Sequence, residues 1–268
     1  MKLSVLVEDT APSGSGLGCE HGFSALVEAD GKRILFDTGQ SCMFLENAEK
    51  MGVEIENLDF VVLSHGHYDH TGGLPSLSRS IDLTSATLLA HPLAFEGKFY
   101  PGGKDIGCPM LLEYLTPLFG GVLMTKEPYP ISKNIYFTGE VPRLYEKPEE
   151  VGRHYESGVI RPDFMPDDSS LVFRIGKRLV VVSGCAHAGI LNISKYAESL
   201  FEGKIHALIG GFHLLNAGQE RLETIISEFG RMRVEEIYPG HCTGEHAIEE
   251  MGKKLSVTRI RSGTILEV

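Results

Sequence analysis

Apolar and polar positions alternate along the first quarter of the chain in a way that predicts short strands followed by a helix. Residues 2–9 alternate like a strand, and residues 23–39 form a hairpin in which two apolar runs flank an Asp-Gly turn. Residues 41–52 fit a helix that ends at a glycine. Residues 58–65 form an apolar, β-branched run that is typical of a buried strand. This strand carries His65 at its C-terminal end.

The last hundred residues repeat this succession of hairpin, buried strand and helix. A hairpin is predicted for residues 169–187 and a terminal hairpin or strand pair for residues 257–268. Between them, helices are predicted for residues 189–201, 218–232 and 244–255, and strands for residues 204–214 and 234–241. The two ends of the chain therefore predict two packed sheets flanked by helices and built from two related halves.

The middle of the chain, at about residues 75–165, is less regular. Two strand-like runs, residues 86–92 and 134–141, are separated by pieces that are rich in proline and glycine. Because apolar and aromatic residues continue through this region, we interpret it as an insertion that shapes the active site. The whole chain, residues 1–268, is then a single domain.

Composition narrows the range of functions. Hydrophobic residues make up 42% and charged residues 23% of the 268 residues, and the formal net charge is −11. Without a basic cluster, such a chain is not expected to bind nucleic acid or an anionic membrane, although a local pocket for a small anion stays open. Five cysteines without a CxxC pair predict reduced thiols and a cytoplasmic location. The sequence does not indicate an oligomeric state.

The stretch LSHGHYDHTGGL, residues 63–74, carries the strongest chemical signal. His65 and His67 are two positions apart, so in an extended segment they point the same way and can bind one ion. Asp69 and His70 follow where the chain turns, and they can face a second ion. Two neighbouring divalent ions suit hydrolysis, because they lower the pKa of a shared water molecule and bind the oxygens of a phosphate or carbonyl group.

This stretch resembles the signature of the metallo-β-lactamase superfamily. The resemblance extends to EHGFSALVEADGKRILFDTGQS, VVVSGCAHAGILN, IGGFHLL and YPGHCTG, and so covers nearly the whole chain. It implies an α/β fold, the four-layer α/β/β/α sandwich of that superfamily, with one or two metals at the edge of the sheets. The later segments resemble one branch, whose members are labelled synthases of a dihydropterin–ribofuranosylaminobenzene phosphate in the assembly of tetrahydromethanopterin-type cofactors.

The resemblance completes a shell for two divalent metal ions, most simply zinc, with manganese and iron as alternatives. His187 and His241 each follow a predicted strand, at positions where the family has a later histidine. Their alternative is that of buried histidines satisfied by the backbone. The expected metal ligands are His65, His67, Asp69, His70, His187 and His241. We assign His187 to the metal of the first two histidines and His241 to the metal of Asp69 and His70.

The chain departs from the superfamily pattern at two places. Cys185 stands where the family usually has a bridging aspartate, and it is either a thiolate ligand or, as we favour, a small buried spacer. Asp167 and Asp168 stand where a histidine usually precedes the second hairpin, and an ordinary turn and cap is their alternative.

Other residues are candidates for roles around the metals. Asp69 is expected to hold both metal and water, and His213 to donate a proton to a leaving group or to bind substrate, unless it is a packed core histidine. Glu20 and His21 are expected to face the substrate or to support the ligands. Candidates for binding an anionic substrate are His91, Lys98, Lys104, Arg143, Arg153 and Arg161. We expect the two lysines to be exposed to solvent.

The sequence thus predicts a metal-dependent, hydrolase-like enzyme acting on a small ester or phosphorylated substrate, or the pterin-phosphate synthase that the branch label suggests. The alternatives are a phosphodiesterase or phosphoesterase, and a non-catalytic metal-binding or redox module.

Overall fold

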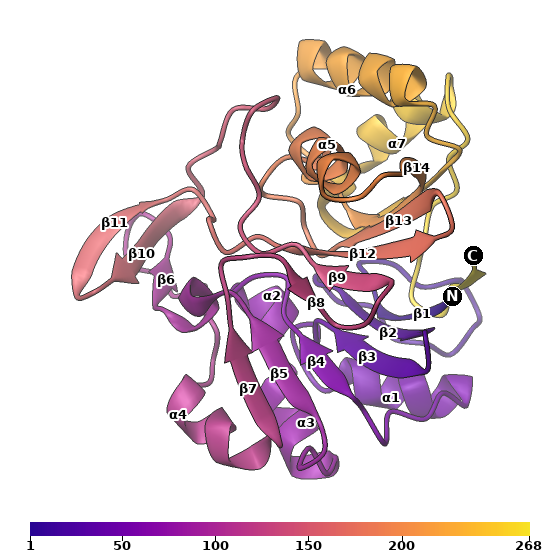
Figure 1. The fold of residues 1–268 in the computed structure, drawn as a ribbon. Coiled ribbons are helices and arrows are strands. Elements are labelled where there is room, and N and C mark those ends of the chain that lie inside the picture. Colours follow the sequence, from indigo (N-terminus) through magenta and orange to yellow (C-terminus); the bar gives the residue numbers. More distant parts are fainter. The chain divides into compact units, whose positions relative to one another are not determined.

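The computed structural model describes residues 1–268 and divides them into two compact units. The first unit comprises Met1–Lys126, Glu150–Asp167 and Arg261–Val268, and the second comprises Glu127–Glu149 and Asp168–Ile260. Each unit contains its own mixed sheet (Figure 1).

The first unit contains two sheets. Its seven-stranded sheet has the order β16-β1-β2-β3-β4-β5-β7 and is formed by β1 (Lys2–Val7), β2 (Ser24–Ala29), β3 (Lys32–Phe36), β4 (Phe60–Val62), β5 (Thr87–Ala90), β7 (Gly121–Met124) and β16 (Ile265–Glu267). A small sheet has the order β11-β10-β6 and is formed by β6 (Lys98–Phe99), β10 (Gly152–Glu156) and β11 (Val159–Asp163). The helices are α1 (Met43–Met51), α2 (Tyr68–Thr71), α3 (Leu74–Ser80) and α4 (Leu112–Leu115), with the 3-10 helices η1 (Pro92–Phe95) and η2 (Thr116–Leu118).

Helices α1 and α3 cover one face of the large sheet (Figure 1). Their apolar side chains, among them Phe44 and Leu77, share one core cluster with Leu35 of β3 and Val61 of β4. Strands β3, β4 and β5 are parallel neighbours in this sheet. The carboxyl ends of β3 and β4 therefore lie side by side, and the residues that follow them meet at one edge of the sheet.

The second unit has a six-stranded sheet with the order β15-β14-β13-β12-β9-β8. Its strands are β8 (Tyr129–Pro130), β9 (Ile135–Phe137), β12 (Ser170–Ile175), β13 (Arg178–Ser183), β14 (Lys204–Gly211) and β15 (Glu236–Gly240). Its helices are α5 (Ile190–Leu200), α6 (Gln219–Met232) and α7 (Glu245–Gly252), with the 3-10 helix η3 (His241–Thr243).

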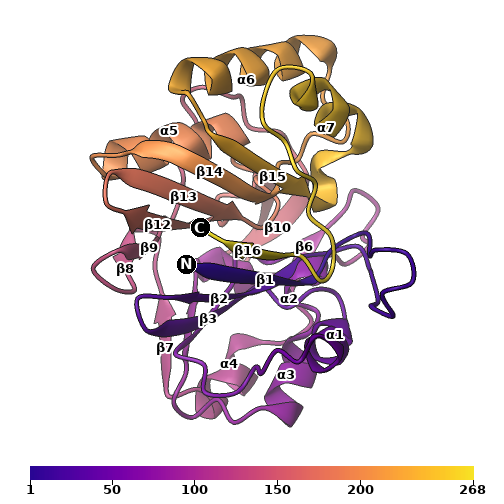
Figure 2. The same ribbon diagram turned by 90° about the vertical axis from the view of Figure 1, so that its right-hand side faces the viewer.

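Helices α5, α6 and α7 lie on one face of this second sheet (Figure 2). Ile193, Phe229 and Met251, one from each helix, belong to the core cluster that also contains Val181 and Leu208 of the sheet. Strands β13, β14 and β15 are parallel, so their carboxyl ends also gather at one edge.

Most of the predicted elements are present at both ends of the chain. The two predicted hairpins are β2–β3 and β12–β13, and the four predicted helices contain α1, α5, α6 and α7. For residues 257–268, where a terminal hairpin or strand pair is predicted, the hairpin is wrong. Val257 forms a bridge to Ile237, whereas β16 pairs with β1.

The irregular middle region contributes to both units. Residues 75–126 and 150–165 belong to the first unit, and residues 127–149 belong to the second. That the chain is one domain with an insertion here stays a prediction. None of the helices is both long and apolar enough to cross a membrane.

Candidate metal centre

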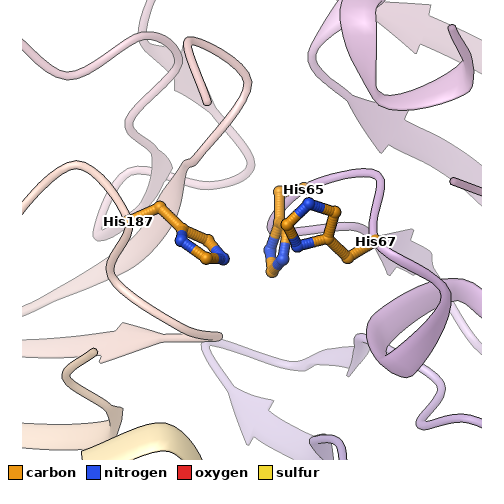
Figure 3. A group of neighbouring side chains, drawn as sticks. All are labelled: His65, His67 and His187. Atoms are coloured by element: carbon orange, nitrogen blue, oxygen red, sulfur yellow. The ribbon is translucent and has the colours of Figure 1, made fainter. Parts of the chain in front are cut away.

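The first unit brings four of the predicted ligands together in the segment between β4 and the end of α2. His65 and His70 are fully buried, and His67 and Asp69 are almost so. The ring centroid of His65 lies 4.8 Å from that of His67 and 4.2 Å from that of His70. Figure 3 shows His65 and His67 close together on this segment, and it also draws His187 of the second unit.

Asp37 and Ser64 orient two of these imidazoles. Asp37 follows β3 and accepts hydrogen bonds from His70 Nδ1 at 2.7 Å, from the Ser64 backbone at 2.7 Å and from Ser64 Oγ at 2.7 Å. Ser64 Oγ in turn lies 2.9 Å from His65 Nδ1. With both Nδ1 atoms engaged as donors, Nε2 of His65 and of His70 carries the lone pair that a metal requires. Neither Asp37 nor Ser64 was predicted, although Asp37 lies in FDTG, directly after a buried strand.

Asp69 is flanked by two imidazoles. Its Oδ2 atom lies 3.4 Å from His21 Nε2 and 3.5 Å from His70 Nε2, and His21 Nδ1 lies 3.1 Å from Asp9. His21 therefore contacts a predicted ligand directly. Glu20 does not lie beside Asp69 in the same way: it accepts hydrogen bonds from the Gln40 and Ser41 backbones and from Ser41 Oγ, and so fixes the loop before α1.

A buried ion cluster supports the backbone between His65 and His67. The Gly66 N–H donates to Asp167 Oδ2 at 2.9 Å, and Lys98 Nζ lies 2.9 Å from both Asp167 Oδ1 and Asp163 Oδ2. Lys98 is fully buried, so the expectation that it is exposed to solvent is wrong: two carboxylates compensate its charge inside the protein. Lys104 is exposed, as expected.

Burial and neighbouring charges set the protonation states in this unit. Burial lowers the pKa of His67 to about 4, against the opposing charge of Asp69, so the ring is neutral and able to bind a metal at neutral pH. Burial also disfavours the charged forms of Lys98 and Asp167. The attraction between the two charges outweighs the effect of burial, so the pKa of Lys98 is raised and that of Asp167 is lowered.

In the second unit, His187 lies on the loop between β13 and α5. The Ala188 N–H donates to Asp168 Oδ2 at 2.8 Å, and Arg143 Nη1 donates to the His187 carbonyl at 2.9 Å. Ala186, with φ 59°, adopts the left-handed conformation that turns this loop. Asp168 and Arg143 therefore both hold the backbone that carries His187.

Cys185 and His213 lie next to His187. The ligand atoms of these three residues all lie within 4.8 Å of one another, and Cys185 Sγ is 3.4 Å from His213 Nδ1. Cys185 Sγ also lies 2.8 Å from Cys242 Sγ, which accepts a hydrogen bond from the His213 backbone at 3.2 Å. Cys185 is buried, as a spacer would be, but its neighbours are imidazoles and a thiol, which are ligand-type groups.

His241 begins η3 directly after β15, and it is also buried. Burial raises the pKa of the Cys242 thiol, but the Cys185 hydrogen bond and the nearby His241 and His213 hold it well below its usual value. Burial lowers the pKa of His213, and the Cys242 hydrogen bond and charge more than offset this, so the net shift is upward. The assignment of the six ligands to two metals stays a prediction.

The remaining anion-binding candidates do not form one patch. Arg153 and Arg161 lie on the β10–β11 hairpin, paired with Glu150 and Glu156. His91 is buried at the start of η1, where its Nδ1 accepts a hydrogen bond from a backbone N–H and burial lowers its pKa to about 4.

Comparison with known proteins shows the family of this chain. The family model of the metallo-beta-lactamase superfamily matches residues 17–107, which include the first four predicted ligands. The chain belongs to the metallo-beta-lactamase superfamily.

Two proteins of Methanocaldococcus jannaschii are similar over nearly the full length. The uncharacterized protein MJ0448 is 37% identical over 252 residues, which cover 94% of each chain. The 7,8-dihydropterin-6-methyl-4-(beta-D-ribofuranosyl)-aminobenzene-5'-phosphate synthase is 32% identical over 286 aligned positions, covering 100% of this chain and 96% of the synthase.

A crystal structure of Tm1679, described as a metal-dependent hydrolase of the beta-lactamase superfamily, superposes with a TM-score of 0.87 at 32% identity. The match covers 100% of this chain and 99% of that one. The predicted fold class is thereby confirmed: the chain has the metallo-beta-lactamase fold.

Proposed function

We propose that this chain is a metal-dependent, hydrolase-like enzyme acting on a small anionic substrate, with an ester or phosphate group at the reacting centre. The single observation that carries the proposal is the hydrogen-bond network of Asp37 and Ser64. It engages Nδ1 of His65 and of His70 and so leaves Nε2 of both imidazoles to bind a metal, beside Asp69. A core packed for stability alone does not need four buried ligand-type side chains on one short segment.

We further propose two divalent ions, most simply zinc, on the six predicted ligands. The donor set of the first unit fits such ions, because neutral imidazole and carboxylate groups are their usual ligands. When bound, the ions supply an activated water molecule and polarise the substrate. Asp69 orients that water through its carboxylate.

His213 is proposed as the proton donor to the leaving group. The upward pKa shift keeps more of its imidazole protonated near neutral pH, as a general acid requires. Its Nδ1 atom faces Cys185, so Nε2 is the atom proposed to deliver the proton.

The pterin-phosphate synthase is the second candidate. Its support is the similarity to the M. jannaschii synthase over the whole of this chain. The substrate would then also be phosphorylated, and metals held by the six predicted ligands would supply polarisation of the displaced group. A phosphodiesterase is the third candidate. In every case we propose a small-molecule partner rather than nucleic acid or membrane, and a cytoplasmic location.

Metal analysis with an activity screen tests the proposal. Wild-type protein is expected to take up zinc, manganese or iron and to hydrolyse at least one of p-nitrophenyl phosphate, bis-p-nitrophenyl phosphate and p-nitrophenyl acetate. The His67→Ala variant is expected to lose metal and turnover. His246→Ala is the matched control, because His246 is exposed on α7. A wild-type protein that binds none of the metals and is inactive on every substrate would falsify the proposal.

A further inference from the structure

Two buried cysteines meet at the carboxyl edge of the second sheet. Cys185 follows β13, and Cys242 lies in η3, after β15. Strand β14 lies between these two strands in the sheet, so the two side chains approach each other past its end. Cys185 and Cys242 are 4% and 8% exposed.

Gly211, the last residue of β14, leaves the space for this approach. A Cβ atom at that position would lie 2.4 Å from the Gly184 carbonyl oxygen, 2.9 Å from Cys242 Sγ and 3.1 Å from Cys185 Cα. Contacts that short require something to move, so any larger residue here would disturb one or both cysteines. The absence of a side chain at residue 211 therefore leaves room for the Gly184 carbonyl and for the thiol pair.

The two sulfur atoms are only 2.8 Å apart, and Cys242 Sγ also donates to the Cys185 carbonyl at 3.2 Å. A disulfide bond is about 2.05 Å long, so a small movement of the side chains brings the sulfur atoms to bonding distance. Cys42 and Cys108 differ, since their thiols contact Glu46 and the Met110 carbonyl instead.

We propose that Cys185 and Cys242 form a reversible oxidation site, which a small peroxide converts into an intramolecular disulfide. One sulfur attacks the O–O bond of hydrogen peroxide, giving a sulfenic acid and one water molecule. The second sulfur attacks the sulfenic sulfur, the S–S bond forms, and a second water molecule leaves. Two thiols are oxidised and one peroxide is reduced to two waters. A dithiol such as dithiothreitol reverses the change by exchange and becomes a cyclic disulfide.

The low exposure of both cysteine residues determines which oxidants can reach them. Hydrogen peroxide is close to water in size and reaches a nearly buried thiol, whereas a bulky disulfide such as oxidised glutathione does not. The short separation then favours closure of the disulfide over further oxidation of the first sulfur.

Oxidation should also change the metal affinity at the carboxyl edge of the second sheet. Cys185 is two residues before His187 and Cys242 directly follows His241, so closing the disulfide draws together the segments that carry these two predicted ligands. This consequence rests on the proposed function. We expect oxidised protein to take up less zinc than reduced protein.

Thiol mapping of the full chain tests the chemistry without any metal. Metal-free reduced protein is treated with hydrogen peroxide, alkylated under denaturing conditions, digested without reductant and analysed by mass spectrometry. We expect alkylation at Cys19, Cys42 and Cys108, and a cross-linked peptide pair that contains Cys185 and Cys242. Dithiothreitol should restore all five thiols.

Variants make the test specific. Cys185→Ser and Cys242→Ser should each lose the cross-link and carry sulfenic or sulfinic acid on the remaining cysteine, whereas Cys108→Ser should form it like wild type. Alkylation of all five cysteines after peroxide, or sulfinic acids without a cross-link in wild type, would overturn the oxidation site.

A final comparison separates the two claims. Zinc uptake is measured by equilibrium dialysis on reduced and on oxidised wild-type protein. A cross-link together with unchanged zinc uptake would leave the oxidation site standing and overturn its link to the metal. Failure of the hydrolase proposal would leave the thiol map unaffected.

Discussion

Replacing Lys98 by methionine should destabilise the protein far more than the position of Lys98 in the two-residue strand β6 suggests. Methionine keeps an apolar side chain of similar length but removes the charge that faces Asp163 and Asp167. At 2.9 Å, each ion pair has a Coulomb energy of about 6 kcal/mol at an effective dielectric constant of about 20, before the cost of desolvation. Removing one partner of a buried pair has a net cost of about 3–5 kcal/mol. We expect a loss of that size in the free energy of unfolding.

The assay is urea unfolding of metal-free wild type and variant, followed by circular dichroism. Lys253→Met is the matched control, because Lys253 pairs with Glu250 on the exposed side of α7 and should change little. If Lys98→Met and Lys253→Met unfold at the same urea concentration, the buried cluster does not stabilise the fold as we reason.

The pH dependence of this difference provides a second check. The pKa of Asp167 is lowered, so its contribution is present above the ordinary carboxylate pKa of about 3.9 and is lost as the pH falls through the folded value. The pKa of Lys98 is raised, so its contribution is complete below about pH 10.4 and is lost as the pH rises through the folded value. The advantage of wild type over Lys98→Met should therefore be largest between these limits and shrink in acid.

Three further substitutions probe the ligand segment and its surroundings. Asp37→Asn removes the acceptor for His70 Nδ1–H, so zinc affinity measured by competition with a chromophoric chelator should fall by about 10–100-fold; an unchanged affinity would contradict the orienting role. His213→Gln should lower kcat by about 10²–10⁴-fold with little change in KM and remove the alkaline limb of the pH–rate profile; an intact limb would mean that another group donates the proton. Gly66→Ala places a Cβ atom 2.2 Å from the Ala94 carbonyl oxygen and should lower Tm, whereas Gly230→Ala, in α6 with open space around it, should leave Tm equal or higher.

The sequence predicted the ligand segment because its chemistry is local. The apolar run of β4 and the closely spaced histidines need no distant information, and the structure places His65, His67, Asp69 and His70 together. Helices α1, α5, α6 and α7 were equally readable from their periodicity, whereas the short helices α2, α3 and α4 were not predicted.

The supports of the site were not predictable in the same way. Lys98 looks like a surface lysine because its partners, Asp163 and Asp167, come more than sixty residues later. Asp37 contacts His70, which is 33 residues away in the chain. The strand β16 pairs with β1 at the opposite end of the sequence, whereas the local pattern of the last residues predicted only a hairpin or strand pair. Long-range pairing of this kind produces no periodic pattern of apolar residues in the sequence.

Asp167 and Asp168 are consecutive residues that accept hydrogen bonds from different backbone amides. Asp167 holds the Gly66 amide in the first unit, and Asp168 holds the Ala188 amide in the second. Only one peptide bond joins the two aspartates, so an inserted residue would move one carboxylate away from the amide that it binds. Insertions during evolution, or loops grafted by protein engineers, should therefore be tolerated at the tip of a hairpin such as Gly176 but not between these two aspartates. In an alignment of homologues, this dipeptide should be a point at which the chain length never varies.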